Sequence, residues 1–322
     1  MLTVGRDTIV VAASAGGVEA LRVLLGTLPA ELPAAVLVAP HLPPRDGGGL
    51  AGVLDRAGPL KAVPAEDAAT VEHGHVYVAR PGHHLLVHDG RIRLSHGPRH
   101  HGHRPAADPL FISAALDAGV RVAGVVLSGA LDDGARGCVA VEGRGGAVAV
   151  QDPAEAAFPG MPSAALEAVP NAAVLPVREL AGWLVRQTRT PVITEGEADD
   201  AEIRREISRL LPGPDPAEPD GALAGLGCPE CGGAMYERAG HYVCRVGHAW
   251  SGESFVDAQS DAVERALWVA VQRLEERVRI LDRMAGRRFA AREEAARARE
   301  ALDTIRVLQV QVGGGDGSLL AR

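Results

Sequence analysis

The chain lacks the features that mark several large classes of protein. Aromatic side chains make up only 3% of its 322 residues, so the core must be built from Val, Leu, Ile and Ala, as in a buried parallel sheet. Basic residues are not in excess: 33 Lys and Arg stand against 41 Asp and Glu, a formal charge of −8. This balance argues against a general nucleic-acid-binding protein.

Long hydrophobic runs are also missing. The longest, such as 120–127, are far shorter than the roughly 20 residues of a membrane span. The N-terminus has no basic region followed by an extended apolar segment, so no signal peptide is predicted. We therefore expect a cytoplasmic protein with no membrane span and no nucleic-acid partner.

Length and composition predict more than one structural unit. A chain of 322 residues exceeds the usual size of a single domain. At residues 211–216, prolines and acidic residues replace the alternating strand and helix patterns, which indicates a linker. Just before it, residues 199–211 carry apolar side chains at helical spacing, so a short helix either closes the first domain or leads out of it.

A serine follows the first apolar run on a turn rich in small residues. Ser14 lies between the strand-like residues 8–11 and a helix-like stretch, 18–28. Gly16 and Gly17 permit a sharp turn, and a helix starting there would direct free N–H groups toward an anion beside the hydroxyl. The segment fits a nucleophilic serine, but also a phosphate-binding turn or a merely structural one. No G-x-x-x-x-G-K-[ST] or G-x-G-x-x-G string supports a nucleotide site.

Two further apolar runs end in residues that could assist a nucleophilic serine. Residues 35–38 lead to His41, and residues 120–127 lead to Asp132 and Asp133. In an open parallel sheet, catalytic groups gather beyond the carboxyl ends of the strands. A histidine that removes the serine proton and a carboxylate that orients the histidine are the groups that acyl transfer needs. The order Ser, His, Asp differs from that of the α/β-hydrolases and of two familiar protease families.

Six spaced motifs in order from about residue 8 to 177 resemble the catalytic domain of the chemotaxis protein-glutamate methylesterases, the CheB type. The matching strings are VVAASAGGVEALRVLLGTLP, VAPHLPP, HGHVYVARPGHHLL, HRPAADPLF, VVLSGALDDGARG and QDPAEAAFPGMPSAAL. The resemblance implies a doubly wound α/β fold with a mostly parallel sheet flanked by helices. It also implies a serine esterase that hydrolyses glutamate γ-methyl esters on a chemoreceptor-like protein, with glutamine deamidation as a second candidate activity.

The resemblance assigns roles to individual residues. It implies that Ser14 is the nucleophile, His41 the base and Asp133 the third member of a triad. The backbone N–H of Ala130, which replaces a methionine of the family, and that of Ala15 would hold the oxyanion. Arg104, in the string HRP, would contact the substrate, or else form an ordinary loop salt bridge.

Two departures from the family pattern bear on these roles. Ala12 replaces a glycine two residues before the serine, which requires a negative φ there. Asp132 replaces an asparagine, so a second acid lies beside the proposed orienting aspartate. We expect Asp133 to face His41, with Asp132 a solvated or loop-capping acid.

The family commonly carries an N-terminal receiver domain that controls the esterase. This sequence begins seven residues before the first predicted strand, so we expect no control by phosphorylation within the chain.

Beyond the linker, three cysteines and a histidine form a second motif. Cys228 and Cys231 form a C-x₂-C pair, and after twelve intervening residues Cys244 and His248 form a C-x₃-H pair. Three thiolates and an imidazole suit a closed tetrahedral zinc site, which stabilises structure and does not catalyse. A metal-free knuckle and a redox pair are the alternatives. The fourth cysteine, Cys138, is expected in the core.

Nine of the twelve histidines fall between residues 73 and 103. Such density suggests a metal site. However, His100, His101 and His103 lie in a Gly/Pro/Arg-rich stretch, so we expect most of them to be solvated loop residues.

Residues 254–310 carry apolar side chains at three- and four-residue steps, interrupted at Gly286. This pattern predicts two antiparallel helices or one long kinked helix, whose outer face could recruit a partner or form a dimer. The predicted parts are an α/β catalytic domain (1–190), a helix and linker (191–224), a zinc-ribbon-like module (225–252), a helical hairpin (253–312) and a disordered tail (313–322).

The expected cofactor is therefore one structural zinc ion, with none needed for catalysis. The alternative function is a catalytically inactive scaffold that binds a signalling partner through the zinc and helical extension.

Overall fold

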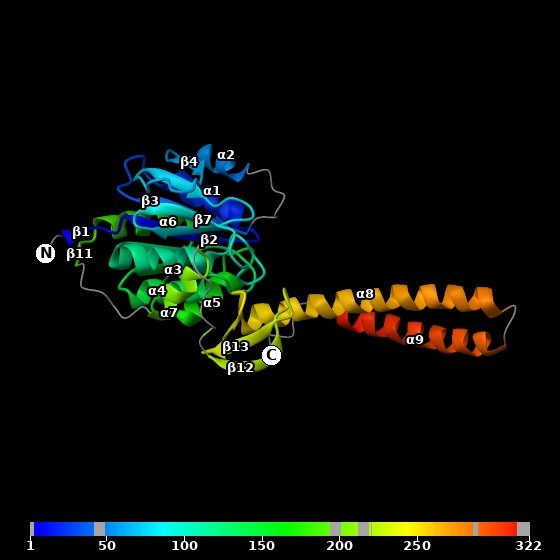
Figure 1. Ribbon diagram of the computed structural model, residues 1–322. Helices are drawn as coiled ribbons and strands as arrows, with labels where there is room; N and C mark the ends of the chain where they lie inside the picture. The colour runs from blue at the N-terminus through cyan, green and yellow to red at the C-terminus, as the bar shows by residue number, and fades with distance from the viewer. Residues whose placement is uncertain are drawn as a thin grey trace. The chain divides into compact units, whose positions relative to one another are not determined.

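The computed structural model describes residues 3–41, 49–193, 201–211, 219, 221–285 and 289–313. It divides into two compact units, one ending at Ser254 and one beginning at Phe255 (Figure 1). The first unit contains a large sheet flanked by helices, followed by a small antiparallel sheet. The second consists of two long helices.

The first unit is built on a seven-stranded sheet in which all neighbouring strands are parallel. The strand order is β10-β9-β8-β2-β3-β5-β4. These strands are β2 (Thr8–Ala13), β3 (Ala35–Pro40), β4 (Lys61–Pro64), β5 (His75–Val78), β8 (Val122–Val126), β9 (Ala147–Gln151) and β10 (Ala173–Leu175).

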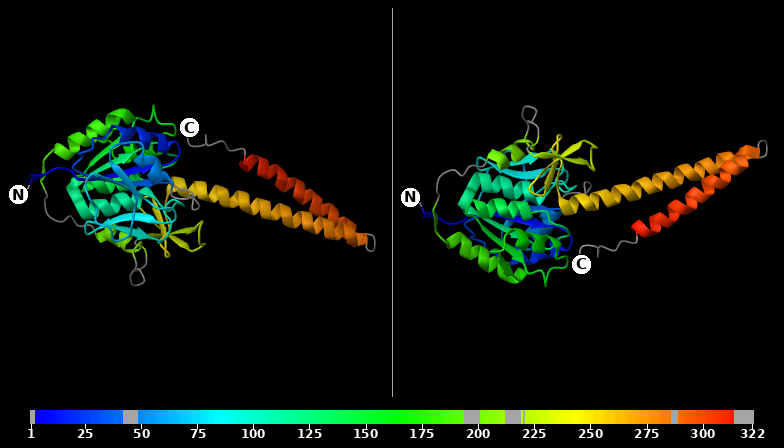
Figure 2. Two further views of the ribbon diagram at one scale, coloured as in Figure 1. Left: turned by 90° about the horizontal axis from the view of Figure 1, so that it is seen from above. Right: turned by 90° about the horizontal axis from the view of Figure 1, so that it is seen from below.

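Helices cover both faces of this sheet (Figure 2). One face packs against α1 (Gly17–Thr27), α2 (Leu50–Asp55) and α6 (Val177–Arg189). The other packs against α3 (Ala107–Ala118), α4 (Ala135–Gly143) and α5 (Gly160–Ala168).

The central strand shows why the sequence folds this way. All six residues of β2 are buried. Because successive side chains point to opposite faces, Ile9 and Val11 join the core on the α1 side, while Val10 and Ala12 join the core on the α3 side. The predicted doubly wound, mostly parallel α/β fold is confirmed.

Strand β2 is also the point at which the strand order reverses. From β2 the chain first builds one side of the sheet, passing through β3 to the edge strand β4 and back to β5, and later fills the other side with β8, β9 and β10. In such sheets, functional groups collect at the carboxyl ends of the strands beside the reversal. The residues after β2, β3 and β8 therefore meet at one edge.

Smaller elements complete this α/β domain, the part of the first unit up to Leu211. Strands β6 and β7 form an antiparallel hairpin that packs on α3, where the backbone N–H of Val87 donates to Ser113 Oγ at 3.1 Å. A short antiparallel pair, β1 and β11, lies outside the main sheet. The bounds of these elements are β1 (Thr3–Val4), β6 (His84–His88), β7 (Arg91–Ser95), the 3₁₀ helix η1 (Gly119–Arg121), β11 (Val192–Ile193) and α7 (Ala201–Ser208).

Helix α7 packs against the α/β domain. Ile207 and Leu210 are buried in a small cluster with Leu86 of β6 and Ile112 of α3. Of the segment predicted at 199–211, residues 201–211 are described, and they close the first domain. Most of the predicted linker, 212–218 with residue 220, lies outside the described residues.

A four-stranded antiparallel sheet follows, in the order β12-β13-β14-β15. Its strands span residues 222–251, and this segment is called the ribbon module below. It begins three residues before the predicted position 225. The strands are β12 (Ala222–Gly227), β13 (Ala234–Arg238), β14 (His241–Cys244) and β15 (Ala249–Ser251).

The second unit contains most of α8 (Gly252–Ala285) and all of α9 (Phe289–Gly313). Val278 and Leu281 pack against Ala295 and Ala298. Ion pairs also connect the helices, such as Arg306 Nη2 to Glu275 Oε1 at 2.8 Å. Two antiparallel helices are therefore present, in agreement with the first of the two predicted arrangements. The interruption at Gly286 lies outside the described residues, and so does the predicted tail except Gly313, which ends α9.

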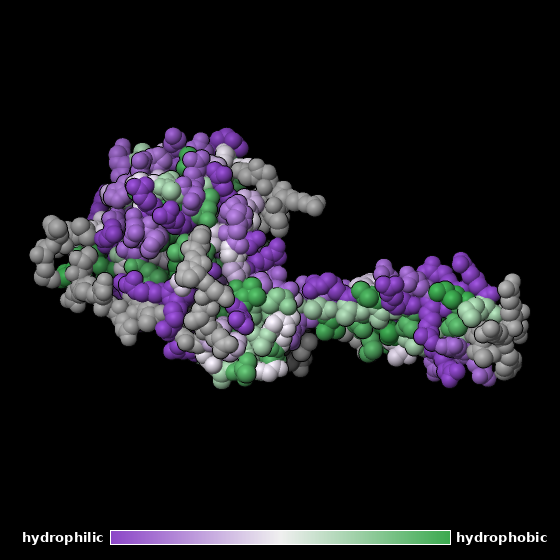
Figure 3. All heavy atoms as spheres, in the orientation of Figure 1, coloured by the Kyte–Doolittle hydropathy of each residue, from purple (hydrophilic) through white to green (hydrophobic). Residues whose placement is uncertain are grey.

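Within the described ranges, no helix combines the length and the apolar character needed to cross a bilayer. Figure 3 shows hydrophilic residues over most of the visible face of the α/β domain, and a hydrophobic patch over the ribbon module. Leu223 and Leu226 of β12 are among the exposed apolar residues there.

Truncating Leu210, which follows α7, tests whether α7 and the residues after it pack on the α/β domain. Leu210 is buried, so Leu210→Ala should lower the free energy of unfolding of that domain by about 2–4 kcal/mol. Leu223→Ala, a matched change at an exposed position, should change it by less than about 0.5 kcal/mol. Denaturant unfolding of the full chain measures both values, and equal effects would show that α7 contributes nothing to the domain.

Candidate active site

Ser14 occupies a tight turn between β2 and α1. Its N–H donates to the carbonyl of Ser128 at 3.0 Å, and its own carbonyl accepts from the N–H of Gly17 at 2.9 Å. Gly16 has a φ of 71°, and a Cβ there would lie 2.8 Å from Ser128 Oγ, so only glycine fits. Ala12 lies within β2 and is not among the residues with positive φ, as its side chain requires.

His41 follows β3 directly and lies between Ser14 and Asp133. Its backbone N–H donates to the carbonyl of Ala13 at 2.9 Å, which fixes the residue beside the serine turn. Nδ1 lies 3.0 Å from Ser14 Oγ, and Nε2 lies 2.6 Å from Asp133 Oδ2. In the tautomer with the proton on Nε2, the ring donates to Asp133 and accepts the hydroxyl proton of Ser14.

Asp133 is held by the first turn of α3. Oδ2 accepts the N–H of Ala107 at 2.6 Å, and Oδ1 accepts that of Asp108 at 3.0 Å. Burial alone would raise the pKa of Asp133, but the hydrogen bond from His41, the charge of His101 and the N–H of Ala107 outweigh it. The pKa of Asp133 therefore lies well below its ordinary range, and the carboxylate is ionised when it orients His41.

Asp132, the other acid of the pair, points elsewhere. Its Oδ1 lies 3.8 Å from Nδ1 of His101, and the side chain is 16% exposed. Burial raises the pKa of Asp132. Of the two predicted roles of Asp132, that of a solvated acid is wrong, because Ser251 of the ribbon module and His101 cover it, whereas the loop-capping role stays a prediction. Asp133 is the acid that contacts His41.

The residues proposed to hold the oxyanion lie next to the serine. A Cβ at Gly129 would approach Ser14 Cβ to 2.9 Å and would collide with the side chain of Met161, so the chain passes Ser14 here only because residue 129 is glycine. Among the hydrogen bonds of the described residues, none is donated by the N–H groups of Ala15 or Ala130. Both groups remain available, and their role stays a prediction.

Ser128 and Gln151, which the motifs did not single out, fix this edge of the site. Gln151 Oε1 accepts the N–H of Ser128 at 2.9 Å, and Ser128 Oγ donates to the carbonyl of Ala15 at 2.8 Å. The same hydroxyl accepts the N–H of Phe158 at 3.0 Å. The loop after β8 is thereby tied to the serine turn.

Arg104 holds its own loop together. Its Nη1 donates to the carbonyls of His96 and Gly97 at 2.7 and 2.6 Å. These partners are backbone carbonyl oxygens, whereas the loop salt bridge considered for Arg104 would require a carboxylate. Its predicted contact with the substrate stays a prediction.

The histidines at 100 and 101 are buried, so the prediction of solvated loop residues is wrong for them. His100 is 2% and His101 7% exposed. The backbone of this loop pairs with β15: the N–H of His101 donates to the carbonyl of Ala249 at 2.8 Å, and the N–H of Ala249 donates to that of Arg99 at 3.3 Å. Sequence reasoning missed this because the partner strand lies about 150 residues away along the chain.

His103 keeps part of its surface accessible and stacks on the catalytic candidate His41. The ring centroids are 3.9 Å apart, and the planes differ by 15°. Desolvation by the surrounding protein, followed by the nearby His41, lowers the pKa of His103 to about 4. A neutral ring therefore covers one face of His41 at neutral pH.

Asp108 connects the triad to α4, a role the sequence analysis did not assign. Its Oδ1 accepts the N–H groups of Gly134 and Gly137, at 3.0 and 2.7 Å, and so caps the first turn of α4. Its Oδ2 lies 2.9 Å from His101 Nε2. The only available signal was its place in the string HRPAADPLF, which gives no partner.

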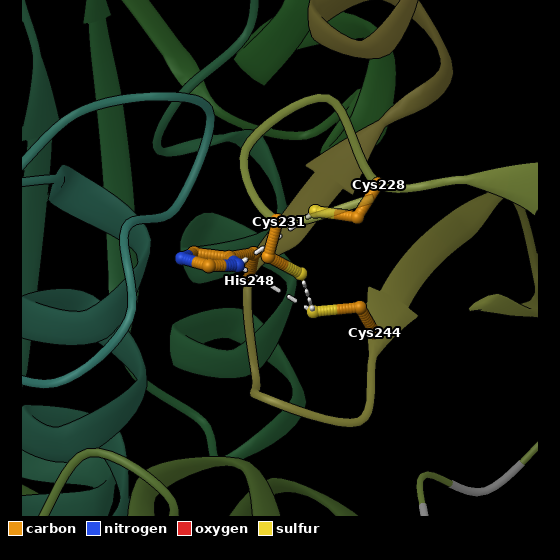
Figure 4. A group of neighbouring side chains, drawn as sticks. All are labelled: Cys228, Cys231, Cys244 and His248. Carbon is orange, nitrogen blue, oxygen red and sulfur yellow. Dashed lines mark hydrogen bonds between the residues drawn. The ribbon is translucent and has the colours of Figure 1, made fainter. Parts of the chain in front are cut away.

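The predicted metal ligands come together in the ribbon module (Figure 4). Sγ of Cys231 lies 3.7 Å from Sγ of Cys244, and Nδ1 of His248 lies 3.5 Å from Sγ of Cys244 and 3.7 Å from that of Cys228. Tetrahedral bonds of about 2.3 Å to sulfur and about 2.0 Å to nitrogen place neighbouring ligand atoms about 3.5–3.8 Å apart. The arrangement therefore fits one tetrahedral metal ion.

All four cysteines are free thiols, so none of the candidate metal ligands forms a disulfide. Cys138 is fully buried among apolar residues of the α3 side, as expected. Burial raises the pKa of its thiol well above the ordinary value, which makes it a poor nucleophile.

Comparisons with known proteins relate this site to a family. The model of the family described as CheB methylesterase matches residues 9–184. The chain is 39% identical over 181 residues to "Protein-glutamate methylesterase/protein-glutamine glutaminase 1" of Xanthomonas campestris, and this match covers 55% of the chain and 50% of that protein. The chain thus spans about half the length of that relative.

Two further matches extend over almost the whole of the other protein. A putative protein-glutamate methylesterase/protein-glutamine glutaminase of Leptospira interrogans is 34% identical over 181 residues, which cover 56% of this chain and 94% of that protein. The crystal structure of the Thermotoga maritima CheB methylesterase catalytic domain superposes with a TM-score of 0.54 and 30% identity, over 57% of this chain and 99% of that one. With its α/β domain and its Ser14, His41 and Asp133 geometry, the chain belongs to the CheB methylesterase family.

Proposed function

We propose that the chain is a serine esterase that hydrolyses glutamate γ-methyl esters on a chemoreceptor-like protein. The observation that carries this proposal is the continuous series of contacts from Ser14 Oγ through His41 to Asp133, at 3.0 and 2.6 Å. A phosphate-binding turn would not need an imidazole on the serine hydroxyl.

In the proposed reaction, Ser14 Oγ attacks the ester carbonyl while His41 Nδ1 takes its proton. The tetrahedral oxyanion is held by the free N–H groups of Ala15 and Ala130. The protonated His41, stabilised by Asp133, then gives the proton to the departing methoxy oxygen, and methanol leaves. His41 next removes a proton from water, which attacks the acyl-enzyme. As the bond between the acyl carbon and Ser14 Oγ breaks, His41 returns that proton to Ser14 Oγ, and the glutamate side chain is released.

Glutamine deamidation would follow the same course, with ammonia as the leaving group. The names of the relatives include both activities. Nothing in the contacts of Ser14 or His41 separates the two substrates, so methyl ester hydrolysis is proposed first and deamidation as a second activity of the same site.

The rival function is a scaffold without catalysis. An inactive chain would have no need of an imidazole that lies 3.0 Å from Ser14 Oγ and 2.6 Å from Asp133 Oδ2. These features support the enzyme over the scaffold. Recruitment of a partner by the helical hairpin stays a prediction; its exposed apolar residues include Trp268, Val269 and Ile280. The cytoplasmic location expected from the sequence also stays a prediction.

We also propose that Cys228, Cys231, Cys244 and His248 hold one structural zinc ion. Four protein ligands leave no open position for a substrate or a water nucleophile. The metal would fix the turns before β13 and β15 and would take no part in ester hydrolysis.

Replacement of the nucleophile tests the proposed function. Ser14→Ala should lower the rate of methanol release from a methylated receptor by at least about a thousandfold, because no other group replaces the attacking oxygen. Ser163→Ala, at an exposed serine on α5, is the matched control and should leave the rate unchanged. Unchanged turnover in Ser14→Ala would refute the assignment, and no methanol release by the wild type would favour the scaffold.

The two adjacent acids should differ sharply. Asp133→Asn removes the charge that orients His41 and should lower kcat by about 10³–10⁴-fold, whereas Asp132→Asn should cost less than about tenfold. Steady-state methanol release by both variants measures the difference. If Asp132→Asn proved to be the more damaging change, the assignment of Asp133 to the triad would be wrong.

Metal analysis tests the ribbon module. The purified chain should contain one zinc per molecule, and Cys231→Ser should lose most of it because a thiolate ligand is removed. Cys138→Ala, which alters the cysteine distant from the motif, should keep the full content. Elemental analysis measures the zinc content, and a thiol titration counts the free cysteines. A metal-free wild type with four titratable thiols would contradict the proposal.

A further inference from the structure

His101 lies between the triad and the start of α8. Its Nε2 is 2.9 Å from Asp108 Oδ2, and its Nδ1 is 2.9 Å from Ser254 Oγ. The side chain is 6% exposed, and its backbone N–H is bound by Ala249 of β15. One ring therefore contacts both the α/β domain and the segment that follows the ribbon module.

Three carboxylates surround this ring. Asp108 lies at 2.9 Å, Asp132 at 3.8 Å and Asp133 at 3.9 Å from its nitrogens. Burial alone would lower the pKa of His101, but the hydrogen bond to Asp108 and the charges of the three acids outweigh it and raise the pKa to about 9. The ring is an imidazolium at neutral pH. The other ionisable groups near it are His41, His100 and His103, with His241 of β14 and Arg136 of α4.

Ser254 is held in place by the first turn of α8. The N–H of Ser251 donates to Ser254 Oγ at 3.0 Å, and the N–H of Ser254 donates to Ser251 Oγ at 3.0 Å. This reciprocal arrangement is a capping box with serine at both positions. The hydroxyl that meets His101 is thus fixed by its own helix. It lies 70 residues beyond the segment that matches the CheB methylesterase family.

We propose that His101 is a positioning residue for the triad of Ser14, His41 and Asp133, and that Ser254, at the start of α8, holds it in place. This inference rests on the esterase function proposed above. It assigns Ser254, which lies outside the part of the chain that matches the family, a role in supporting the active site.

The imidazolium supplies the positive charge that the acidic cluster needs. Asp108 donates its N–H to Asp133, caps α4 and binds His101, so a displaced His101 disturbs the support of Asp133 directly. Without the imidazolium, Asp108 loses a partner that fixes its carboxylate, and the support that Asp108 gives to Asp133 is weakened. Asp133 then orients His41 less firmly toward Ser14.

The grouping of His101, Asp108 and Asp133 also has the geometry of a small metal site. The contacts argue against a metal there. Asp133 Oδ2 is bound to His41 and to the N–H of Ala107, and both nitrogens of His101 face acceptors, as a protonated ring requires.

The test measures kcat and KM for methanol release against pH, with the full chain and three variants. His101→Gln should lower kcat about tenfold and Ser254→Ala about threefold, with KM changed less than about twofold in each. The kcat of the wild type should fall as the pH rises through about 9, where His101 loses its proton, and His101→Gln should lack this fall. Ser260→Ala, at an exposed serine further along α8, is the control and should behave as the wild type.

A second measurement uses stability. Because the pKa of His101 rises from 6.5 to about 9 on folding, its contribution to stability is complete below about pH 6.5 and is lost as the pH rises through about 9. The thermal unfolding midpoint of the wild type should therefore fall between pH 7 and 10 more than that of His101→Gln. If His101→Gln fails to fold, Ser254→Ala carries the kinetic test alone.

The outcomes separate this inference from the proposed function. An active wild type with an inactive Ser14→Ala, but with unchanged kcat in Ser254→Ala and His101→Gln, would overturn the positioning role and leave the esterase intact. A lower kcat in His101→Gln together with a wild-type kcat that shows no decline near pH 9 would also overturn it, because that result indicates a merely structural residue. If the wild type releases no methanol, the proposed function fails and this inference fails with it.

Discussion

The hydrogen bonds that hold the carboxylate of Asp133 are the constraint on which the site depends. Two backbone N–H groups of the first turn of α3 donate hydrogen bonds to its oxygens, and His41 contacts the same carboxylate at 2.6 Å. A charge at a helix N-terminus meets unpaired N–H donors and the positive end of the helix dipole. The negative charge that a catalytic imidazole needs is thus kept in a buried position by backbone groups that cannot titrate.

The parallel sheet provides the geometry around this charge. Its strand order reverses at β2, so the ends of β2, β3 and β8 lie at one edge and bring residues 14, 41 and 133 together. Gly129 and Gly16 let backbone segments approach the serine where any side chain would collide. The helices on both faces then fix the edge by burying nearly the whole of the central strands.

Much of the fold and of the two candidate sites could be predicted from local patterns in the sequence. Apolar runs ending in Ser14, His41 and Asp133 pointed to one sheet edge, and the cysteine spacing pointed to a cluster of four ligands. The sequence could not predict contacts between residues that lie far apart along the chain. His101 looked solvated because its partners, Ala249 and Ser254, lie some 150 residues away, and Asp132 looked exposed because the covering strand could not be placed. Propensity and periodicity report a residue's neighbours in the chain, whereas burial depends on its neighbours in space.

Asp108 and Asp133 each cap the start of one of the two helices α3 and α4. Asp133, from the segment that leads into α4, closes the start of α3, while Asp108, from α3, closes the start of α4. Each acid therefore serves the architecture as well as the chemistry. A descendant of this protein that abandoned hydrolysis would be free to lose its serine and histidine, yet would still be under selection to retain both acids. Their survival in a relative would accordingly say little about whether that relative is an enzyme.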